Sequence, residues 1–445
     1  MDPMLHQPLE RIETDTVLPA AADIVIIGGG IAGISTAYFL ARKGISVVVL
    51  EKGIVGAEQS SRNWGWCRQQ GRALSELGLA RRSLDLWESL PEQIGADLGF
   101  RRTGVVFVTD DPSELAGWER WCEAAQPYQV HSRILTAAEA QARTPGSARR
   151  WLGGLSTPSD GRAEPAKAAP FLARAARQHA AVVLENCAAR LIETAAGRVA
   201  GVVTERGSIR TGTVLCAGGA WSSLFCRRHG IDLPQAVVHG SVARTTAGPD
   251  LLPECVATPG FAARRRTDDG YTVAMSGRGT VHLTPSLLRY GWKFLPMYLQ
   301  RRKGLKIRLG KAFFDELFAA RWTGDQVSPF EKTRIIDPPA DMELLGRGLA
   351  EFHMTFPELA TLGIADSWGG AIDSMPDLIP VMSPVDAMPG FFIATGFSGH
   401  GFGIGPGTGE AMAELVTGGK PAVDLQPFRY SRLHDGTRLR PDGKF

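Results

Sequence analysis

A glycine-rich turn between two short apolar runs most constrains how this chain can fold. The first run, Ile24–Ile27, leads into Gly28-x-Gly30-x-x-Gly33, and a second apolar run ends at Glu51 after a helix-like stretch. In a strand–helix–strand unit, such glycines permit a tight turn, close approach of the backbone to a pyrophosphate and close helix–strand packing. The acid at the end of the second strand accepts a hydrogen bond from a ribose hydroxyl. The helix start also favours phosphate. We therefore predict a dinucleotide site. Its predicted residues in this unit are Gly28, Gly30, Ile31, Ala32, Gly33, Glu51 and Lys52.

Length and composition narrow the class of protein. The chain has 445 residues, more than one ordinary core holds, so two or more domains are expected. A net charge of +3 is too small to indicate nucleic-acid binding. Six scattered cysteines, without a CxxC pair or adjacent histidines, favour reduced structural thiols over a disulfide framework or a metal site. Residues 1–22 lack the apolar core of a signal peptide, and we expect a cytoplasmic protein.

The pattern of an apolar strand ending in glycines occurs twice more. Residues 213–222 contain such an end at Gly218, and residues 391–396 contain another at Gly396. Three separated glycine-rich strand ends around one nucleotide favour FAD over NAD, because FAD is long enough to reach across the sheet. We predict an α/β + α+β fold, in which a Rossmann-like FAD-binding domain carries a discontinuous substrate-binding domain on a mostly antiparallel sheet. The predicted segments are 22–100, 150–235 and 355–425 for the FAD-binding domain, 101–149 and 236–354 for the substrate-binding domain, and 1–21 for an N-terminal extension.

Three motifs together resemble those of a superfamily of flavoenzymes. They are Gly28–Gly33 with Glu51, Ala217–Ser222, and Gly396–Phe402. On these motifs, residues 22–425 are similar to the D-amino-acid oxidase/glycine oxidase/sarcosine oxidase superfamily, whose members are FAD-dependent amine oxidoreductases. The further FAD contacts that this resemblance implies are Gln59, Ser60, Ser61, Arg62, Ala217, Gly218, Trp221, Gly396, Gly399, His400 and Gly401.

A more specific resemblance is to the membrane-associated bacterial L-amino acid deaminases. Two features depart from it. The N-terminal anchor of those enzymes is missing here, and Gly399-His400-Gly401 is similar to the wider superfamily instead. In sarcosine oxidases a cysteine ahead of a Pro-Asp pair bonds the flavin covalently, whereas Gly370 holds that position here, so we expect noncovalent FAD. The segments that carry the resemblance are 58–62, 186–190, 193–194, 202–207, 290–296, 328–332, 368–371 and 376–377.

No catalytic nucleophile, carboxylate pair or metal cluster stands out in the sequence. The superfamily's chemistry does not require one, because the flavin accepts a hydride from the substrate Cα while the protein binds and orients the substrate. The resemblance implies oxidation of the Cα–N bond of an amino acid to an imine, which hydrolyses to a 2-oxo acid and ammonia. Around His400, we expect backbone N–H groups rather than the imidazole to meet the flavin.

An arginine is expected to bind the substrate carboxylate, because its planar guanidinium can donate to both oxygens. Arg278 is similar in position to the substrate arginine of the deaminases, allowing a one-residue gap, and its alternative is a solvated arginine at a turn. Arg68 and Arg72 are rival anchors, since sarcosine oxidases have two arginines after the matching loop, one over the flavin and one on the carboxylate. The alternative is that this loop merely packs its tryptophans. The resemblance places Trp368 in the pocket near the flavin, with a core tryptophan as the alternative.

A basic and aromatic stretch lies within a predicted insertion at residues 285–340. Residues 289–311 contain eight Lys or Arg and no acid, interleaved with aromatic and aliphatic residues. This mixture favours an interfacial membrane contact or an acidic protein partner, and its counterpart in the deaminases belongs to an insertion that is associated with the membrane. We expect peripheral contact with the inner face of the cell membrane, with a solvated helical lid as the alternative. The expected electron acceptor is O2 or a quinone.

The leading hypothesis is therefore an FAD-dependent amino acid deaminase or dehydrogenase acting on a small-molecule amino acid. A same-fold alternative is an oxidase or dehydrogenase of secondary amines, such as proline-like or N-methyl amino acids. A third hypothesis is a flavoprotein subunit of a larger dehydrogenase complex.

Overall fold

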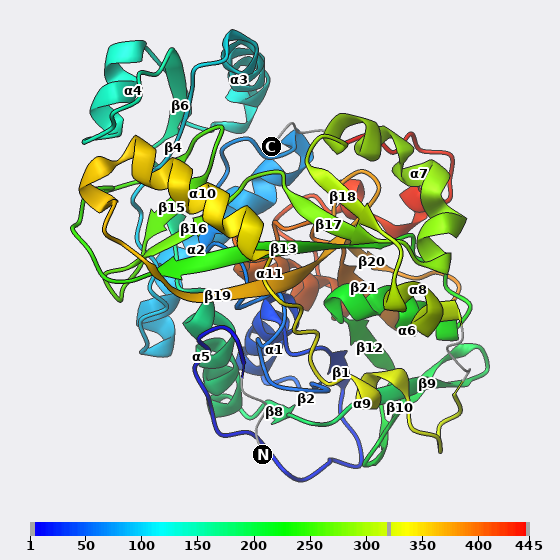
Figure 1. The fold of residues 1–445 in the computed structure, drawn as a ribbon. Coiled ribbons are helices and arrows are strands. Elements are labelled where there is room, and N and C mark those ends of the chain that lie inside the picture. Colours follow the sequence, from blue (N-terminus) through cyan, green and yellow to red (C-terminus); the bar gives the residue numbers. More distant parts are fainter. Residues whose placement is uncertain (1–4, 318–321, 442–445) are drawn as a thin grey trace.

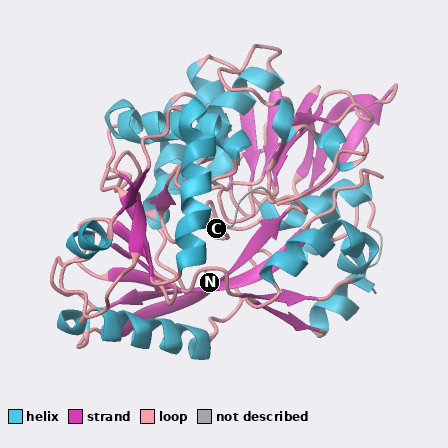
Figure 2. Cartoon of the chain, turned by 90° about the horizontal axis from the view of Figure 1, so that it is seen from above, coloured by secondary structure: helices cyan, strands magenta, loops and turns pink. Residues whose placement is uncertain are grey.

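Two large β-sheets organise the chain, with helices between and around them (Figure 1). The structure, a computed structural model, describes residues 5–317 and 322–441. Residues 1–4 of the expected N-terminal extension and residues 318–321 of the expected insertion lie outside the described residues, as do residues 442–445. Seen from above, the strands form separate groups with helices between them (Figure 2).

The first sheet has six strands, and five of them run parallel. Their order is β20-β21-β12-β1-β2-β8, and β20 is antiparallel to β21. Strands of a parallel sheet covered on both faces are continuously apolar, which explains the short apolar runs of the sequence. The helix of the predicted strand–helix–strand unit is α1 (Ile31–Arg42). The strands are β1 (Ile24–Ile27), β2 (Val47–Leu50), β8 (Val182–Leu184), β12 (Thr213–Cys216), β20 (Val381–Pro384) and β21 (Phe391–Thr395).

Alternate side chains of β1 pack into two different cores. Ile24 and Ile26 face a helical layer, whereas Val25 faces a small antiparallel sheet on the other side. Within the helical layer, α1 packs against both α5 and α11. The helices of this layer are α1, α2 (Leu77–Ile94), α5 (Pro165–Gln178) and α11 (Gly405–Val416), and the small sheet consists of β9 (Ala189–Ala195), β10 (Arg198–Thr204) and β11 (Gly207–Arg210).

The second sheet has ten strands and is mostly antiparallel. Its order is β18-β17-β13-β16-β15-β14-β4-β6-β5, with β19 paired to β13, and its two parallel pairs are β14–β4 and β17–β18. The predicted fold class is thus confirmed. β6 and β19 join this sheet from segments that the sequence analysis assigned to the FAD-binding domain. The strands are β4 (Val105–Thr109), β5 (Arg133–Leu135), β6 (Gly153–Thr157), β13 (Ala236–Thr245), β14 (Cys255–Ala257), β15 (Ala262–Arg265), β16 (Tyr271–Ala274), β17 (Gly279–His282), β18 (Leu305–Arg308) and β19 (Ile364–Ser374).

The basic stretch of the sequence forms part of this second region. It comprises most of the long helix α7 and the strand β18, which extends the edge of the ten-stranded sheet by pairing with β17. Thr284 caps α7 by accepting from the Leu287 N–H. The helices associated with this region are α3 (Pro112–Ala125), α4 (Ala137–Arg143), α7 (Pro285–Arg301), α8 (Lys311–Leu317) and α10 (Met342–Thr355), and a two-stranded sheet pairs β3 (Trp66–Cys67) with β7 (Gly161–Arg162). The helices α6 (Ser222–Arg228) and α9 (Pro329–Lys332) pack instead into the core between the first sheet and the small antiparallel sheet.

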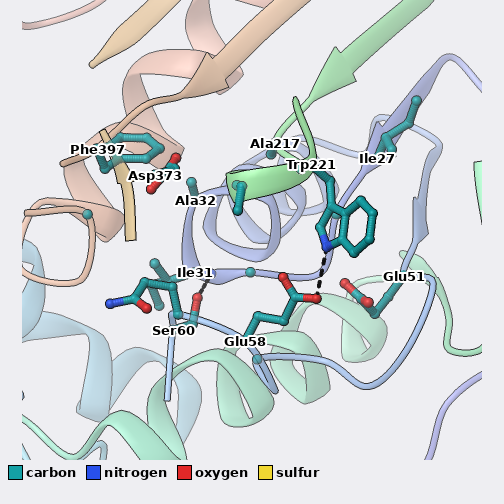
Figure 3. A pocket seen from close by; sticks show the side chains of 18 of the residues that line it. Ile27, Ile31, Ala32, Glu51, Glu58, Ser60, Ala217, Trp221, Asp373 and Phe397 are labelled. Carbon is teal, nitrogen blue, oxygen red and sulfur yellow. Dashed lines mark hydrogen bonds between the residues drawn. The ribbon is translucent and has the colours of Figure 1, made fainter. Parts of the chain in front are cut away.

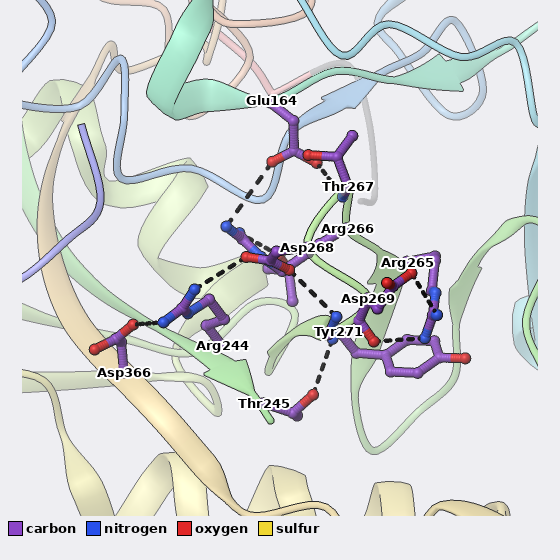
Figure 4. A network of polar contacts seen from close by, with 12 residues as sticks. Glu164, Arg244, Thr245, Arg265, Arg266, Thr267, Asp268, Asp269, Tyr271 and Asp366 are labelled. Carbon is purple, nitrogen blue, oxygen red and sulfur yellow. Dashed lines mark hydrogen bonds and ion pairs between the residues drawn. The ribbon is translucent and has the colours of Figure 1, made fainter. Parts of the chain in front are cut away.

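A polar network that includes the buried Glu164 joins the two regions (Figure 4). Glu164, which immediately precedes α5, accepts from both terminal nitrogens of Arg264 on β15, at 2.7 and 3.1 Å. Its carboxylate also accepts from the Thr267 backbone N–H at 3.1 Å and lies 3.9 Å from Arg266. Because the Glu164 and Arg264 side chains are almost completely buried, this ion pair holds the second sheet against the nucleotide-binding layer.

Candidate active site

The turn between β1 and α1 forms one wall of a long cavity. A Cβ at Gly28 would lie 2.4 Å from the Ala217 carbonyl oxygen, and a Cβ at Gly33 would lie 2.2 Å from the Gly28 carbonyl oxygen. Side chains are therefore excluded where the turn, β12 and α1 meet. The first turn of α1 has no acidic residue, so its positive end faces the cavity without a competing carboxylate. This arrangement suits a phosphate group.

Glu51 lies at one end of the cavity, where β2 stops (Figure 3). Its two carboxylate oxygens accept from the Gly29 and Gly53 backbone N–H groups, at 2.8 and 2.7 Å. Burial raises the pKa of Glu51, against the opposing effect of Lys52. Lys52 itself donates to Glu58, at 2.7 Å, and its Nζ lies 4.5 Å from the centre of the Trp221 ring. The Glu51 carboxylate is thus held in position to accept hydrogen bonds from the hydroxyl groups of a ribose.

The opposite end of the cavity is formed by the chain between β19 and α11. Figure 3 shows Asp373 and Phe397 on the far side from Glu51 and Trp221, with Ile31 and Ser60 between them. Burial raises the pKa of Asp373 to about 6, although its carboxylate accepts from the Gly396 N–H at 2.7 Å.

The lining of this elongated cavity fits FAD. One end offers a ribose-binding acid, the middle offers a helix start, and the other end offers backbone and amide groups. The Gln59 Oε1 atom is buried and has no hydrogen-bond partner within residues 5–317 and 322–441, so a polar group of the cofactor can satisfy it.

Most of the predicted cofactor-binding residues line this cavity, and a few do not. Gly33 packs α1 against β1, Gly396 holds Asp373 through its N–H, and Ser61 accepts from Gln7 at 3.0 Å. His400 and Arg62 line a second cavity instead. The predicted residues that line the first cavity are Gly28, Gly30, Ile31, Ala32, Glu51, Lys52, Gln59, Ser60, Ala217, Gly218, Trp221, Gly399 and Gly401.

A second cavity adjoins the first between the two large sheets. Gln59, Asn63, Gly399 and Phe402 line both cavities, so a ligand in the second lies beside the far end of the first. Part of its wall is aromatic and includes two tryptophans in and just before β3. These aromatic residues are Trp64, Trp66, Phe107 and Trp118.

Arg72 is a deeply buried arginine that lines this second cavity. Only 3% of its surface is exposed, and its Nε and Nη1 atoms have no hydrogen-bond partner among the described residues. Burial lowers the pKa of Arg72, while Glu76 and Asp160 oppose this effect. Arginine nevertheless keeps its charge in proteins. Two unsatisfied donors on a buried cation make Arg72 a site for an incoming anion.

Glu76 and His400 form a polar pair close to Arg72. The His400 Nδ1 atom lies 3.2 Å from the nearer Glu76 oxygen. Burial lowers the pKa of His400 to about 4, with a further contribution from Arg72, so the ring is neutral at pH 7. Burial alone would raise the pKa of Glu76, but His400, Arg72 and Arg68 outweigh it and lower that pKa. An ionised Glu76 therefore balances part of the arginine charge.

Arg68 lies against the aromatic wall, with its guanidinium 5.5 Å from the centre of the Phe107 ring. Burial and the neighbouring charge of Arg72 lower the pKa of Arg68 well below its usual range. Asp160 accepts from the Gln69 and Gln70 backbone N–H groups, at 2.8 and 3.0 Å, and burial raises the pKa of Asp160 to about 6. The turn that carries both arginines is thus fastened to β7 by a buried carboxylate.

Arg278 and Trp368 are the other predicted substrate residues. Arg278 is exposed at the rim of the second cavity, where it donates to the Lys303 carbonyl oxygen at 3.1 Å. Trp368 is buried on β19 and donates from its indole N–H to the Arg62 carbonyl oxygen at 3.2 Å. It lines neither cavity, which matches the core tryptophan that the sequence left as the alternative.

Four residues in these cavities or beside the arginines that line them escaped the sequence analysis. Glu76 follows Arg72 by four residues at the start of the helical segment that leads into α2, and its charge acts on Arg72. Arg301 lines the second cavity. In the sequence it is one of many cations of the basic stretch, and nothing there distinguishes it from its neighbours. Asp160 lies between β6 and β7, and Asp373 lies near the end of β19. Only the packing of distant segments shows that both are buried.

Comparisons with known proteins agree with this geometry. Residues 23–415 match the family described as FAD dependent oxidoreductase. L-amino acid deaminase from Proteus myxofaciens, solved in complex with anthranilate, is 32% identical with a TM-score of 0.92, covering 96% of this chain and 99% of that one. L-amino acid deaminase from Proteus vulgaris is 30% identical with a TM-score of 0.90, covering 94% and 99%.

A curated relative connects the chain to a different amine. Mitochondrial sarcosine dehydrogenase of Homo sapiens is 26% identical over 435 residues, which cover 95% of this chain and 43% of the relative. The chain therefore spans less than half the length of that relative.

Proposed function

This chain belongs to the FAD-dependent oxidoreductase family and acts on CH–NH groups, and we propose that it oxidises a primary α-amino acid to a 2-oxo acid and ammonia. The observation that carries this proposal is Arg72, a buried arginine with unsatisfied donors beside the far end of the nucleotide cavity. Similarity to two L-amino acid deaminases supports the primary amine. Oxidation of a secondary amine remains the alternative, supported by similarity to a sarcosine dehydrogenase.

Each residue of the proposed site has a physical role. Bound FAD supplies the hydride acceptor. Arg72, with Arg68 beside it, holds the α-carboxylate of the substrate and so orients its Cα–H toward the first cavity. Glu76 and neutral His400 keep the surroundings of Arg72 polar and fixed. We place the carboxylate at Arg72 rather than at Arg278, because a buried, water-excluded arginine binds an anion more strongly than an exposed one.

The reaction can be tested by anaerobic reduction of the purified flavoprotein. Loss of the visible absorbance of the oxidised flavin is expected with at least one primary α-amino acid from a panel of L-, D- and imino acids, and the reaction mixture is expected to contain ammonia. A primary amine yields an imine that releases ammonia on hydrolysis, whereas a cyclic imine yields none. Flavin reduction by cyclic or N-methyl amino acids alone would contradict the proposal and support the secondary-amine alternative.

We also propose that the outer face of α7 contacts a membrane surface. Leu288, Trp292, Leu295 and Leu299 are between half and almost three-quarters exposed, and their spacing places them on one side of the helix. Basic residues of the same segment flank this apolar stripe. No helix formed by the described residues is long and apolar enough to cross a bilayer, so the contact is peripheral. A membrane quinone is then an accessible electron acceptor.

Vesicle binding tests this surface. Exchanging Trp292 and Leu295 together for serine is expected to weaken binding to vesicles containing an anionic phospholipid by about 100-fold or more, because burying such side chains contributes roughly 1.5–3 kcal/mol each and about 1.4 kcal/mol is tenfold in affinity. Co-sedimentation at low and high salt measures the change. The matched control is Leu152→Ser. Leu152 is exposed and lies outside α7, so this substitution is expected to leave binding unchanged. Equal binding of both variants, or none by the unmodified chain, would contradict the proposal.

A further inference from the structure

His400 lies where the two cavities meet. Gly399 lines both cavities and Gly401 lines the first, whereas His400 lines the second. The backbone N–H of His400 is already occupied, because it donates to the Phe397 carbonyl oxygen at 2.8 Å. The His400 side chain is 13% exposed, so protein encloses most of the imidazole. What His400 offers to a ligand in the second cavity therefore depends on the hydrogen bonds of its ring.

Glu76 determines which nitrogen of this ring carries the hydrogen. Its two oxygens lie 3.3 and 3.2 Å from the His400 Nδ1 atom. The Glu76 side chain is fully buried, yet His400 and the nearby arginines outweigh burial and lower its pKa, so Glu76 is an anion that only accepts hydrogen bonds. Because burial lowers the pKa of His400 to about 4, the ring is neutral at pH 7 and has a single N–H. That hydrogen is therefore on Nδ1, which leaves Nε2 as an acceptor.

The Nε2 edge of the ring borders the second cavity. Glu76 lies behind the opposite edge and does not line this cavity. Within residues 5–317 and 322–441, the His400 Nε2 atom has no hydrogen-bond partner. Arg72 lines the same cavity with two donors that lack partners among these residues, and its charge, after burial, contributes to the lowered pKa of His400. The cavity thus presents donors for an anion beside an acceptor for an N–H or O–H group.

An α-amino acid matches this pair of groups. Its carboxylate and its amino group are attached to the same carbon, and a primary amino group has N–H donors whether or not it is protonated. A buried acceptor that is left without a donor costs free energy, so a substrate with an apolar group in that place would bind less tightly. Glu76 also polarises the ring through the hydrogen bond at Nδ1, which strengthens Nε2 as an acceptor.

From this arrangement we infer that His400 is the amine-binding residue of the site, with Nε2 accepting from the α-amino group of the substrate while Arg72 holds the α-carboxylate. Glu76 is the positioning residue that fixes the ring. The inference rests on the proposed function and extends it from the carboxylate to the amino group. With two substituents of Cα held, a single configuration directs the Cα–H toward the first cavity, so one enantiomer is expected to react.

Two carboxylates of the same shape test this without catalysis. 2-Aminoisobutyrate has no hydrogen on Cα, so it is not oxidised, and pivalate has a methyl group in place of the amino group. Each is titrated into the holoenzyme while the flavin absorption spectrum is recorded. We expect 2-aminoisobutyrate to bind about tenfold more tightly, because it satisfies Nε2 as well as Arg72. Pentanoate, a longer carboxylate that also lacks an amino group, is titrated in parallel and should respond to every substitution as pivalate does.

Substitutions of the Glu76–His400 pair separate recognition from folding. In His400→Phe, which keeps a ring but has no acceptor, the preference for 2-aminoisobutyrate should fall to about twofold or less, while the affinity for pivalate changes less than about twofold. His400→Gln, whose amide oxygen can take the place of Nε2, should restore part of the preference. Glu76→Gln should lower it in part, because an amide also donates to Nδ1 and then places the ring hydrogen on Nε2. His131→Phe, at an exposed histidine outside both cavities, is the matched control and should behave as the unmodified enzyme.

Flavin reduction by pairs of enantiomers gives a second measurement. One enantiomer of a primary amino acid should reduce the flavin with the higher kcat/KM, and His400→Phe should lower the ratio between the two by about tenfold. Equal affinity for 2-aminoisobutyrate and pivalate, a preference that survives His400→Phe, or an unchanged enantiomer ratio would overturn the inference. If pivalate still bound and amino acids still reduced the flavin, the proposed function would stand without it. If neither carboxylate bound and no amino acid reacted, both would be overturned.

Discussion

Replacing Arg72 with leucine is expected to lower kcat/KM for the amino acid substrate by roughly 100-fold or more, with FAD still bound. The substitution removes the cation proposed to hold the α-carboxylate, whose charge-assisted hydrogen bonds contribute about 1.5–3 kcal/mol. The remaining loss arises because a carboxylate that is not held lets the Cα–H drift from its reactive position. Anaerobic stopped-flow reduction measures both effects, since the limiting rate reports orientation and the concentration dependence reports binding.

Three further variants separate this role from others. Arg72→Lys keeps the charge but lacks the planar fork, so an intermediate loss is expected. Arg81→Leu, an exposed arginine on α2, is the matched control and should leave the reaction unchanged. In Arg278→Leu, pentanoate should still bind. If pentanoate binding were instead lost there and kept in Arg72→Leu, Arg278 would be the α-carboxylate anchor and our placement would be wrong.

The nucleotide-binding half of the fold was predictable because its signals are local. Gly28 and Gly33 lie within six residues of each other, and the contacts that exclude their side chains involve β1, α1 and the next glycine-rich strand end at Ala217. A parallel strand that is buried on both faces can also be recognised in the sequence, because its residues form an uninterrupted apolar run. The assignment of β19 to the nucleotide-binding half failed for the opposite reason. Its partner is β13, more than a hundred residues earlier, and no local pattern records such a pairing.

The substrate cavity was predictable in composition but not in arrangement. Arg68, Arg72 and Arg278 could be nominated because arginine suits a carboxylate, yet the sequence could not rank them. Their ranking depends on burial, which differs sharply between Arg72 and Arg278 and is set by how the two sheets close on the loop. Arg301 shows the same limit, since one residue of a uniformly basic stretch turns inward while its neighbour Arg302 stays in solvent.

The second large effect concerns stability. Replacing Glu164 with alanine is expected to lower the free energy of unfolding by about 3–5 kcal/mol, because it leaves the buried Arg264 without its counter-charge. Chemical unfolding followed by tryptophan fluorescence measures the change. Glu88→Ala breaks an exposed ion pair with Arg102 and is the matched control, with an expected cost of about 1 kcal/mol or less. Replacing Glu164 and Arg264 together with leucine and methionine should cost less than the single change, since no charge is then left buried.

The pH dependence gives an independent check on the same pair. Burial alone would raise the pKa of Glu164, but Arg264 and Arg266 outweigh burial and lower it from its ordinary value of 4.5. A carboxyl whose pKa is lower in the folded than in the unfolded chain adds stability that is fully present above the unfolded pKa and is lost as the pH falls through the folded one. Stability should therefore decline below about pH 4.5 less steeply in Glu164→Gln than in the unmodified chain. An identical decline in both would show that the Glu164–Arg264 pair does not couple the two sheets through its charge.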